Sequence, residues 1–132
     1  MPDSFGRLPF EAEGTGLKAT TALTGVGPVL AACHRLAGEH GVTVTARGSA
    51  AGVLHVGLTA DAEPETVAAV VQALRAATAL FDGTVTVLTA PQEVRDLVDL
   101  WGPVPGLELM RRLKDEMDPD HRLSPGRFVG GI

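Results

Sequence analysis

The groups in this sequence that could do chemistry are few: four histidines, one cysteine and scattered carboxylates. Glu39 and His40 could act as an acid–base pair, but they fall in the last turn of a predicted helix, where a histidine also interacts favourably with the helix dipole. Cys33 falls on the apolar stripe of the same helix without a neighbouring base, which favours core packing. His34 and His121 fall at positions predicted to face solvent. We therefore predict no nucleophile–base pair and no metal site.

A short glycine motif, Gly25-Val26-Gly27, lies between a predicted strand and a predicted helix, as a dinucleotide-binding loop would. The third glycine position of that motif holds Leu30, and the next strand ends in Arg47 where the motif needs an acidic residue. Both differences remove the physical reasons for binding a dinucleotide. We interpret this segment as a tight turn that starts a helix.

Length and composition restrict the possible classes of protein. A chain of 132 residues is the size of one domain, and its single cysteine excludes a disulfide framework. The net charge of −5 disfavours a nucleic-acid partner, because phosphate binding needs a concentrated basic surface. The sequence has no apolar run long enough for a membrane span, and its first residues do not resemble a signal peptide. We expect a soluble, cytoplasmic protein.

The elements that would position these groups follow from hydrophobic periodicity. Alternation with a period of two predicts strands over 17–23, 42–47, 53–59 and 84–88. Helical spacing predicts one helix from Pro28 to Gly41 and a second that begins at Pro64. The resulting order of strand, helix, strand, strand, helix, strand predicts an α+β fold of the ferredoxin-like type. This sandwich has a four-stranded antiparallel sheet with two helices on one face.

The chain divides by pattern into three parts. Residues 1–15 are predicted to be a linker or a trimmed end, and residues 16–90 form the sandwich. Residues 91–132 form a helical extension and docking loop of the same domain, with helices over 91–100 and 107–117 and a loop-like tail. The first of these helices is expected to turn three side chains inward: Val94, Leu97 and Val98.

Strand alternation also predicts a polar sheet face opposite the helices, which would carry Lys18, Thr20, Thr43, Thr45, Arg47, His55, Thr84 and Thr86. An antiparallel sheet can simply show such a face to water. Hydroxyl and basic side chains on a rigid sheet can also receive a small carboxylate substrate. Both interpretations remain open at this point.

The C-terminal segment carries a family resemblance. Residues 109–119 (LMRRLKDEMDP) and 122–132 (RLSPGRFVGGI) resemble the C-terminal signature of FAD-linked oxidases, and the Ala90-Pro91 and Trp101-Gly102 steps are also similar. The nearest match is to the small flavin-type subunit of bacterial glycolate oxidase. In this family an N-terminal domain binds FAD, and a C-terminal cap with a ferredoxin-like sheet covers the flavin.

The resemblance implies roles for individual residues. Arg47, with Thr45 and Lys18, would bind the substrate carboxylate, and His55 would contact the substrate hydroxyl or transfer its proton. The docking loop onto the FAD-binding domain would comprise Ser124, Pro125, Gly126 and Arg127. In this family a 2-hydroxy acid passes a hydride from its α-carbon to the flavin.

Some family features are missing from the sequence. The catalytic dehydrogenase branch has a histidine-rich metal motif followed by Glu-His-Gly. Here His55-Val56-Gly57 continues to Asp61 without the second histidine of the motif, and Glu39-His40-Gly41 comes before it instead of after it. The metal site and the catalytic His–Glu pair are therefore not transferred. Ser124 stands where the family motif has asparagine.

From the resemblance we expect the cap domain of a glycolate oxidase-like flavoprotein, inactive and without flavin as this chain alone. Its expected partners are an FAD-binding domain, upstream or in another chain, other oxidase subunits, and a 2-hydroxy acid. The alternative is a free-standing ferredoxin-like module that binds a small ligand or oligomerises through its polar sheet face.

Overall fold

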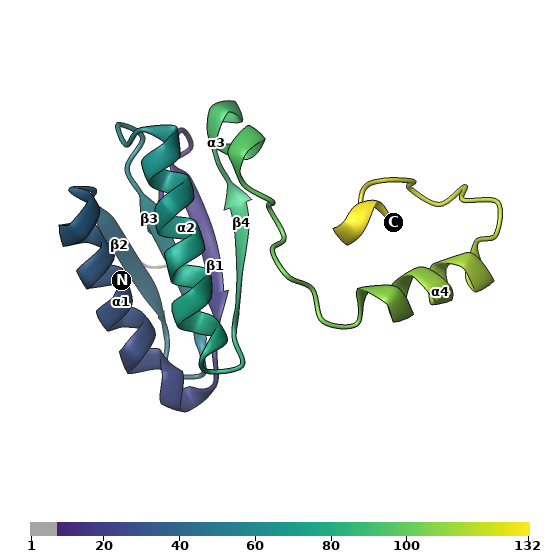
Figure 1. Cartoon of the computed structure of the whole chain (residues 1–132), viewed down its shortest axis with the longest axis horizontal. Helices are drawn as coiled ribbons and strands as arrows, with labels where there is room; N and C mark the ends of the chain where they lie inside the picture. Colours follow the sequence, from purple (N-terminus) through teal and green to yellow (C-terminus); the bar gives the residue numbers. More distant parts are fainter. Residues whose placement is uncertain (1–7) are drawn as a thin grey trace, which may run out of the picture. The chain divides into compact units, whose positions relative to one another are not determined.

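The computed structural model describes residues 8–132. Its regular elements follow one another as strand, helix, strand, strand, helix, strand and then two further helices (Figure 1). Their bounds are β1 Thr15–Thr20, α1 Val26–His40, β2 Val44–Ser49, β3 Val53–Leu58, α2 Pro64–Ala79, β4 Thr84–Thr89, α3 Gln92–Leu97 and α4 Leu107–Met117. Two 3-10 turns complete the set, at Leu23–Gly25 and Val129–Gly131. The chain forms two compact units, which we call the sheet unit, ending at Gly102, and the C-terminal unit, Pro103–Ile132.

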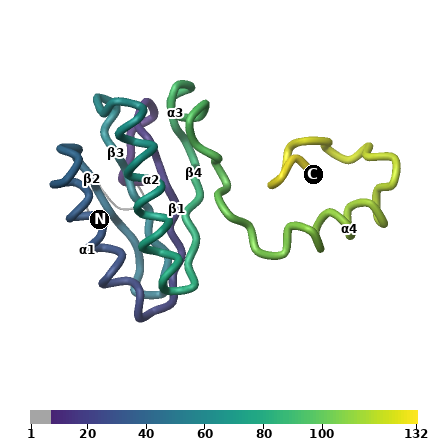
Figure 2. The backbone as a smooth tube through the Cα atoms, in the orientation of Figure 1, coloured from purple at the N-terminus to yellow at the C-terminus, as the bar shows by residue number. Residues whose placement is uncertain are grey.

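The four strands form one antiparallel sheet in the order β2-β3-β1-β4. The predicted α+β class and the βαββαβ order are therefore confirmed. Strands β2 and β3 form a hairpin and are paired along their whole length, and β1 lies between β3 and β4 (Figure 2). A bulge between Gly16 and Leu17 shifts the register of β1 against β4.

One face of the sheet is covered by α1 and α2, which lie next to each other across the strands (Figure 1). Alternate strand residues and one stripe of each helix are buried together, because apolar surface removed from water is the main stabilising term in folding. The largest fully buried apolar side chains of this core are Leu17, Leu36, Leu58, Leu74, Val29, Val56, Val67, Val70, Val71 and Val94. The opposite face, which we call the open face, therefore carries the remaining strand side chains.

The helix boundaries follow local signals in the sequence. Helix α1 ends at Gly41, whose φ of 65° is the left-handed conformation that glycine adopts readily, and α2 begins at Pro64 as predicted. The prediction that Pro28 is the first residue of α1 is wrong, because the helix begins at Val26. Pro28 is tolerated there because the amides of the first turn have no partner within the helix.

The predicted strand boundaries need small corrections. The first strand was expected over 17–23, but β1 ends at Thr20 because the Thr21 amide leaves the ladder and donates to the Gly52 carbonyl (2.9 Å). The hairpin strand β2 continues to Ser49, two residues beyond its predicted end. Leu97 of α3 was expected to point inward, but its side chain is 51% exposed.

Arg75 of α2 holds the segment that follows α3 against the sheet unit. Its guanidinium donates to the carbonyl oxygens of Val85 (3.2 Å) and Asp99 (2.5 Å). A side chain on Gly102 would collide with the guanidinium, which explains a glycine at this position. Burial lowers the pKa of Arg75 below its usual value, and the charge of Asp99 opposes this shift. Arg75 therefore acts as a structural anchor.

Candidate functional site

A row of basic and hydroxyl side chains crosses the open face of the sheet. In the strand register, Lys18 of β1 lies opposite both His55 of β3 and Thr86 of β4, and Arg47 of β2 lies opposite His55. We call these four residues the basic row. Lys18 and Arg47 are exposed, and His55 and Thr86 are half-buried. The sheet thus brings three of the predicted site residues together on adjacent strands.

Thr45, the fourth residue predicted to contact substrate, lies on the same face at the next level of the sheet. It pairs with Gly57, which in turn pairs with Gly16. Thr45 is exposed, whereas both glycines are buried although they belong to the open face. Thr45 is therefore beside the basic row and not within it.

On the other side of the basic row, two hydroxyl groups are already bonded to each other. The Oγ1 atoms of Thr20 and Thr84 are 2.9 Å apart across β1 and β4. This pair ties the end of β1 to the edge strand of the sheet. It also satisfies two hydroxyls that the sequence alone places on the open face.

The segment before β1 covers the two glycines. The aromatic ring of Phe10 lies against Gly16, so that a Cβ on this glycine would be 2.6 Å from a ring carbon. A Cβ on Gly57 would collide with the carbonyl oxygen of Pro9. The sequence predicts a linker over 1–15, and its residues 1–7 lie outside the described part of the chain. Pro9 and Phe10 are packed against the sheet, and this contact was missed.

The basic row has the chemistry of a small-anion site. Neighbouring strands are about 4.8 Å apart, so Lys18 and Arg47 flank His55 at roughly 10 Å from each other. Their side chains are long enough to converge on one carboxylate above the imidazole, with charge-assisted hydrogen bonds. An anion bound between the two side chains would interact favourably with both positive charges.

The predicted docking residues belong to the C-terminal unit. Ser124 and Arg127 lie at the wall of a hollow of about 610 Å³, whose apolar lining comes from α4 and the tail. The main apolar residues of this lining are Met110, Leu113, Met117, Leu123 and Phe128. Each of these five side chains is exposed. The hollow is thus a predominantly apolar surface within the C-terminal unit.

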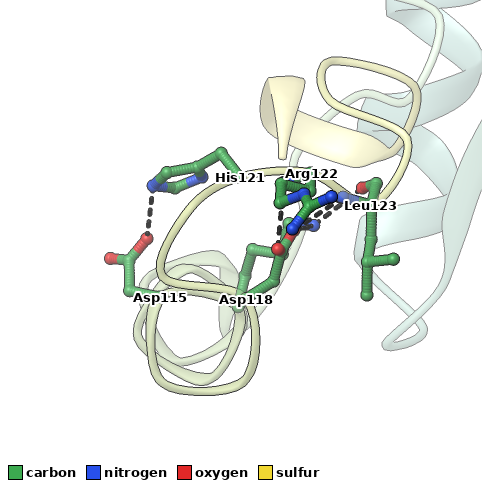
Figure 3. A network of polar contacts seen from close by, with 6 residues as sticks. Asp115, Asp118, His121, Arg122 and Leu123 are labelled. Atoms are coloured by element: carbon green, nitrogen blue, oxygen red, sulfur yellow. Dashed lines mark hydrogen bonds and ion pairs between the residues drawn. The ribbon is translucent and has the colours of Figure 1, made fainter.

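Asp118, which follows α4, organises the loop that carries these residues (Figure 3). Its carboxylate accepts hydrogen bonds from the Lys114 ammonium and from the amides of Arg122 and Leu123, both at 2.9 Å. Lys114 also donates to the carbonyl oxygen of Leu123 (2.7 Å). The bond from Lys114 and then the bond from the Leu123 amide are the largest causes that lower the pKa of Asp118 from 3.8 to about 2. This network fixes the turn before Ser124.

Among the remaining reactive side chains, Cys33 is buried, and Glu39 and His121 lie beside charged partners at the surface. Burial raises the pKa of the Cys33 thiol to about 11, so it stays protonated at neutral pH. Glu39 forms a bidentate ion pair with Arg35 (2.9 and 3.0 Å). His121 lies 3.5 Å from Asp115 at the surface of the C-terminal unit (Figure 3).

The Gly25 turn does not offer a cradle for a nucleotide phosphate. A Cβ on Gly25 would collide with the Thr21 hydroxyl and with the Phe81 side chain. The space beside this glycine is therefore filled by the protein itself. Among the described residues, no group of three or more His, Cys, Asp or Glu side chains could hold a metal ion.

No helix in the described part of the chain is long and apolar enough to cross a membrane. No protein-family model matches the sequence, and a search of curated proteins finds no match. The resemblance to FAD-linked oxidases therefore stays a hypothesis.

Proposed function

We propose that this chain is the ferredoxin-like cap domain of an FAD-dependent oxidoreductase that acts on a 2-hydroxy acid in the cytoplasm. The FAD is held by an FAD-binding domain, upstream or in another chain. The observation that carries the proposal is the basic row, which places Lys18, His55 and Arg47 side by side on the open face. The strand order β2-β3-β1-β4 is also that expected for two split strand–helix–strand halves.

Each residue of the basic row has a distinct task in this proposal. Arg47 and Lys18 bind the substrate carboxylate and hold the α-carbon in one orientation, which lowers the entropic cost of reaction. An imidazole nitrogen of His55 accepts the proton of the 2-hydroxyl group as the carbonyl forms. The flavin, when bound, accepts the hydride from the α-carbon.

The C-terminal unit supports the same proposal through its exposed apolar side chains. Leu113 and Met117 on α4 are exposed together with Leu123 and Phe128 in the tail. A patch of this kind indicates a surface that another protein covers. In the proposal, the loop from Ser124 to Arg127 and this patch dock onto the FAD-binding domain.

Self-association through the open face is the alternative, and the basic row argues against it. In a symmetric face-to-face dimer, the same surface of both copies meets itself. Lys18 and Arg47 of one copy would then approach the same cations of the other. That arrangement brings like charges together at the interface, which is unfavourable.

The substrate site is tested by NMR titration of the ¹⁵N-labelled chain with glycolate and with its neutral amide, glycolamide. We expect saturable shifts of the Lys18, Arg47 and His55 amides with glycolate and none with glycolamide. Arg47→Gln should weaken glycolate binding by about fivefold or more, because it removes a charge-assisted hydrogen bond. The matched control is Arg35→Gln, an exposed arginine on α1. Equal shifts with the neutral amide would contradict a carboxylate site.

The cap function is tested by co-expression with the FAD-binding domain of a glycolate oxidase-like enzyme. We expect a yellow complex that reduces a dye with glycolate, whereas the chain alone is colourless and inactive. Flavin bound to the chain alone would overturn the proposal. A homodimer whose dissociation shifts the open-face amides would support the alternative module instead.

A further inference from the structure

The open face has an apolar border beside the basic row. Gly16 and Gly57 pair with each other, and each is two residues from a member of the row along its own strand. Two residues of strand span roughly 6.6 Å. Phe10 occupies the space above Gly16, so its ring lies next to the level of Lys18 and His55.

Phe10 is half-buried, and its ring lies over Gly16 on the open face. Leu88 of β4 alternates with the core residues Val85 and Val87 and is 48% exposed on the same face. Gly16 pairs with Thr89 and Leu17 pairs with Val87, so Leu88 is the extra residue of the bulge and lies beside Gly16. Two apolar side chains thus belong to the border of a strongly polar row.

The order of groups on this face matches the order of groups in an amphipathic acid. A carboxylate held by Lys18 and Arg47 leaves the far end of the ligand free to extend along the strands. A hydrocarbon substituent that extends toward Gly16 meets the Phe10 ring, which covers that glycine. Glycolate has only hydrogen atoms at this position of its α-carbon, so it cannot contact the ring.

We infer that Phe10, together with Leu88, makes this site selective for 2-hydroxy acids that carry a large hydrocarbon substituent, over glycolate. The inference rests on the proposed function, because it assigns the substrate carboxylate to the basic row. It deepens that function by naming the substrate class. Aromatic and branched aliphatic 2-hydroxy acids, such as phenyllactate and leucic acid, belong to this class.

The test compares dissociation constants of phenyllactate and glycolate, measured by NMR titration of the full chain. Phenyllactate should bind about tenfold more tightly, as expected for burying part of an aromatic ring. Phe10→Ala should remove most of this preference, measured as the ratio of the two dissociation constants. Phe10→Leu, which keeps an apolar cover on Gly16, should retain part of it. Leu80→Ala, an exposed leucine at the end of α2, is the matched control.

The possible outcomes separate the two proposals. If both acids bind but Phe10→Ala leaves their ratio unchanged, the role of Phe10 is wrong and the carboxylate site stands. If glycolate binds more tightly than phenyllactate to the unmodified chain, the inferred selectivity is also wrong. If neither acid shifts the amides of the basic row, the proposed function fails and the selectivity fails with it.

Discussion

The sheet unit buries its apolar side chains, whereas the C-terminal unit exposes most of its own. Leu17 of β1 is fully buried in a cluster drawn from three strands and three helices, but Leu113 of α4 is 58% exposed. Only Val129 and Asp118 are buried among the residues of the C-terminal unit. The first unit therefore has a hydrophobic core of its own, while the second depends on polar contacts around Asp118. This difference indicates that the exposed apolar side chains of the C-terminal unit form a surface for a partner.

The largest expected effect is on the core of the sheet unit. Leu17→Ala should lower the free energy of unfolding by about 2–5 kcal/mol, because it removes buried methyl groups and leaves a cavity. The measurement is urea denaturation followed by circular dichroism. An effect below about 1 kcal/mol would contradict a well-packed core at this position.

A smaller effect is expected at the anchor of the outgoing segment. Arg75→Met keeps the aliphatic stem but leaves the Val85 and Asp99 carbonyls without this donor. We expect a loss of about 1–3 kcal/mol in unfolding free energy, the cost of unsatisfied buried acceptors. Arg95→Met, at an exposed arginine of α3, is the control and should change stability by less than about 0.5 kcal/mol. Equal effects of the two variants would refute the anchor.

Asp118 provides a pH test that distinguishes the two units. Its pKa is about 2 in the folded chain and 3.8 as the ordinary value, so the folded loop favours the carboxylate. The stabilising contribution is complete above about pH 5 and is lost as the pH falls through 3.8 toward 2. NMR shifts of the Arg122 and Leu123 amides should report this loss, while amides of the core strands change less.

Asp118→Asn should reproduce the low-pH state of the loop at neutral pH. The neutral amide keeps the shape of the side chain but loses its ion pair with Lys114. Asp120→Asn, an exposed acid two residues away, is the matched control. If the Arg122 and Leu123 amides keep their shifts in Asp118→Asn, this network does not organise the loop.

The sequence was most informative where structure depends on local periodicity. Alternation in 53–58 separated His55 from its buried neighbours Leu54 and Val56, and this division is confirmed. Contacts between distant segments have no such local signal. Phe10 precedes any periodic pattern, and its place on Gly16 depends on where the chain folds back. The available clue was a pair of glycines on a face otherwise made of larger side chains.

Leu97 illustrates a second limit of sequence patterns. The expected helix over 91–100 would turn Leu97 inward with Val94 and Val98, but α3 ends at Leu97 itself. Val98 has an extended backbone, yet its side chain is buried in the core. Its burial therefore does not need the predicted helix to continue past Leu97. The length of a short helix depends on its tertiary contacts more than on the periodicity of its apolar residues.

The smallest expected effect on stability is at α4, and it sharpens the contrast with Leu17. Leu113→Ala should change the free energy of unfolding of the chain by less than about 0.5 kcal/mol, because the leucine is already mostly exposed. The same variant should weaken assembly with the FAD-binding domain in the co-expression experiment, since the proposal buries this side chain there. Glu116→Ala, at an exposed charged position of α4, is the control for assembly. A large loss of stability with normal assembly would show that Leu113 belongs to an internal core, and the docking role would then be wrong.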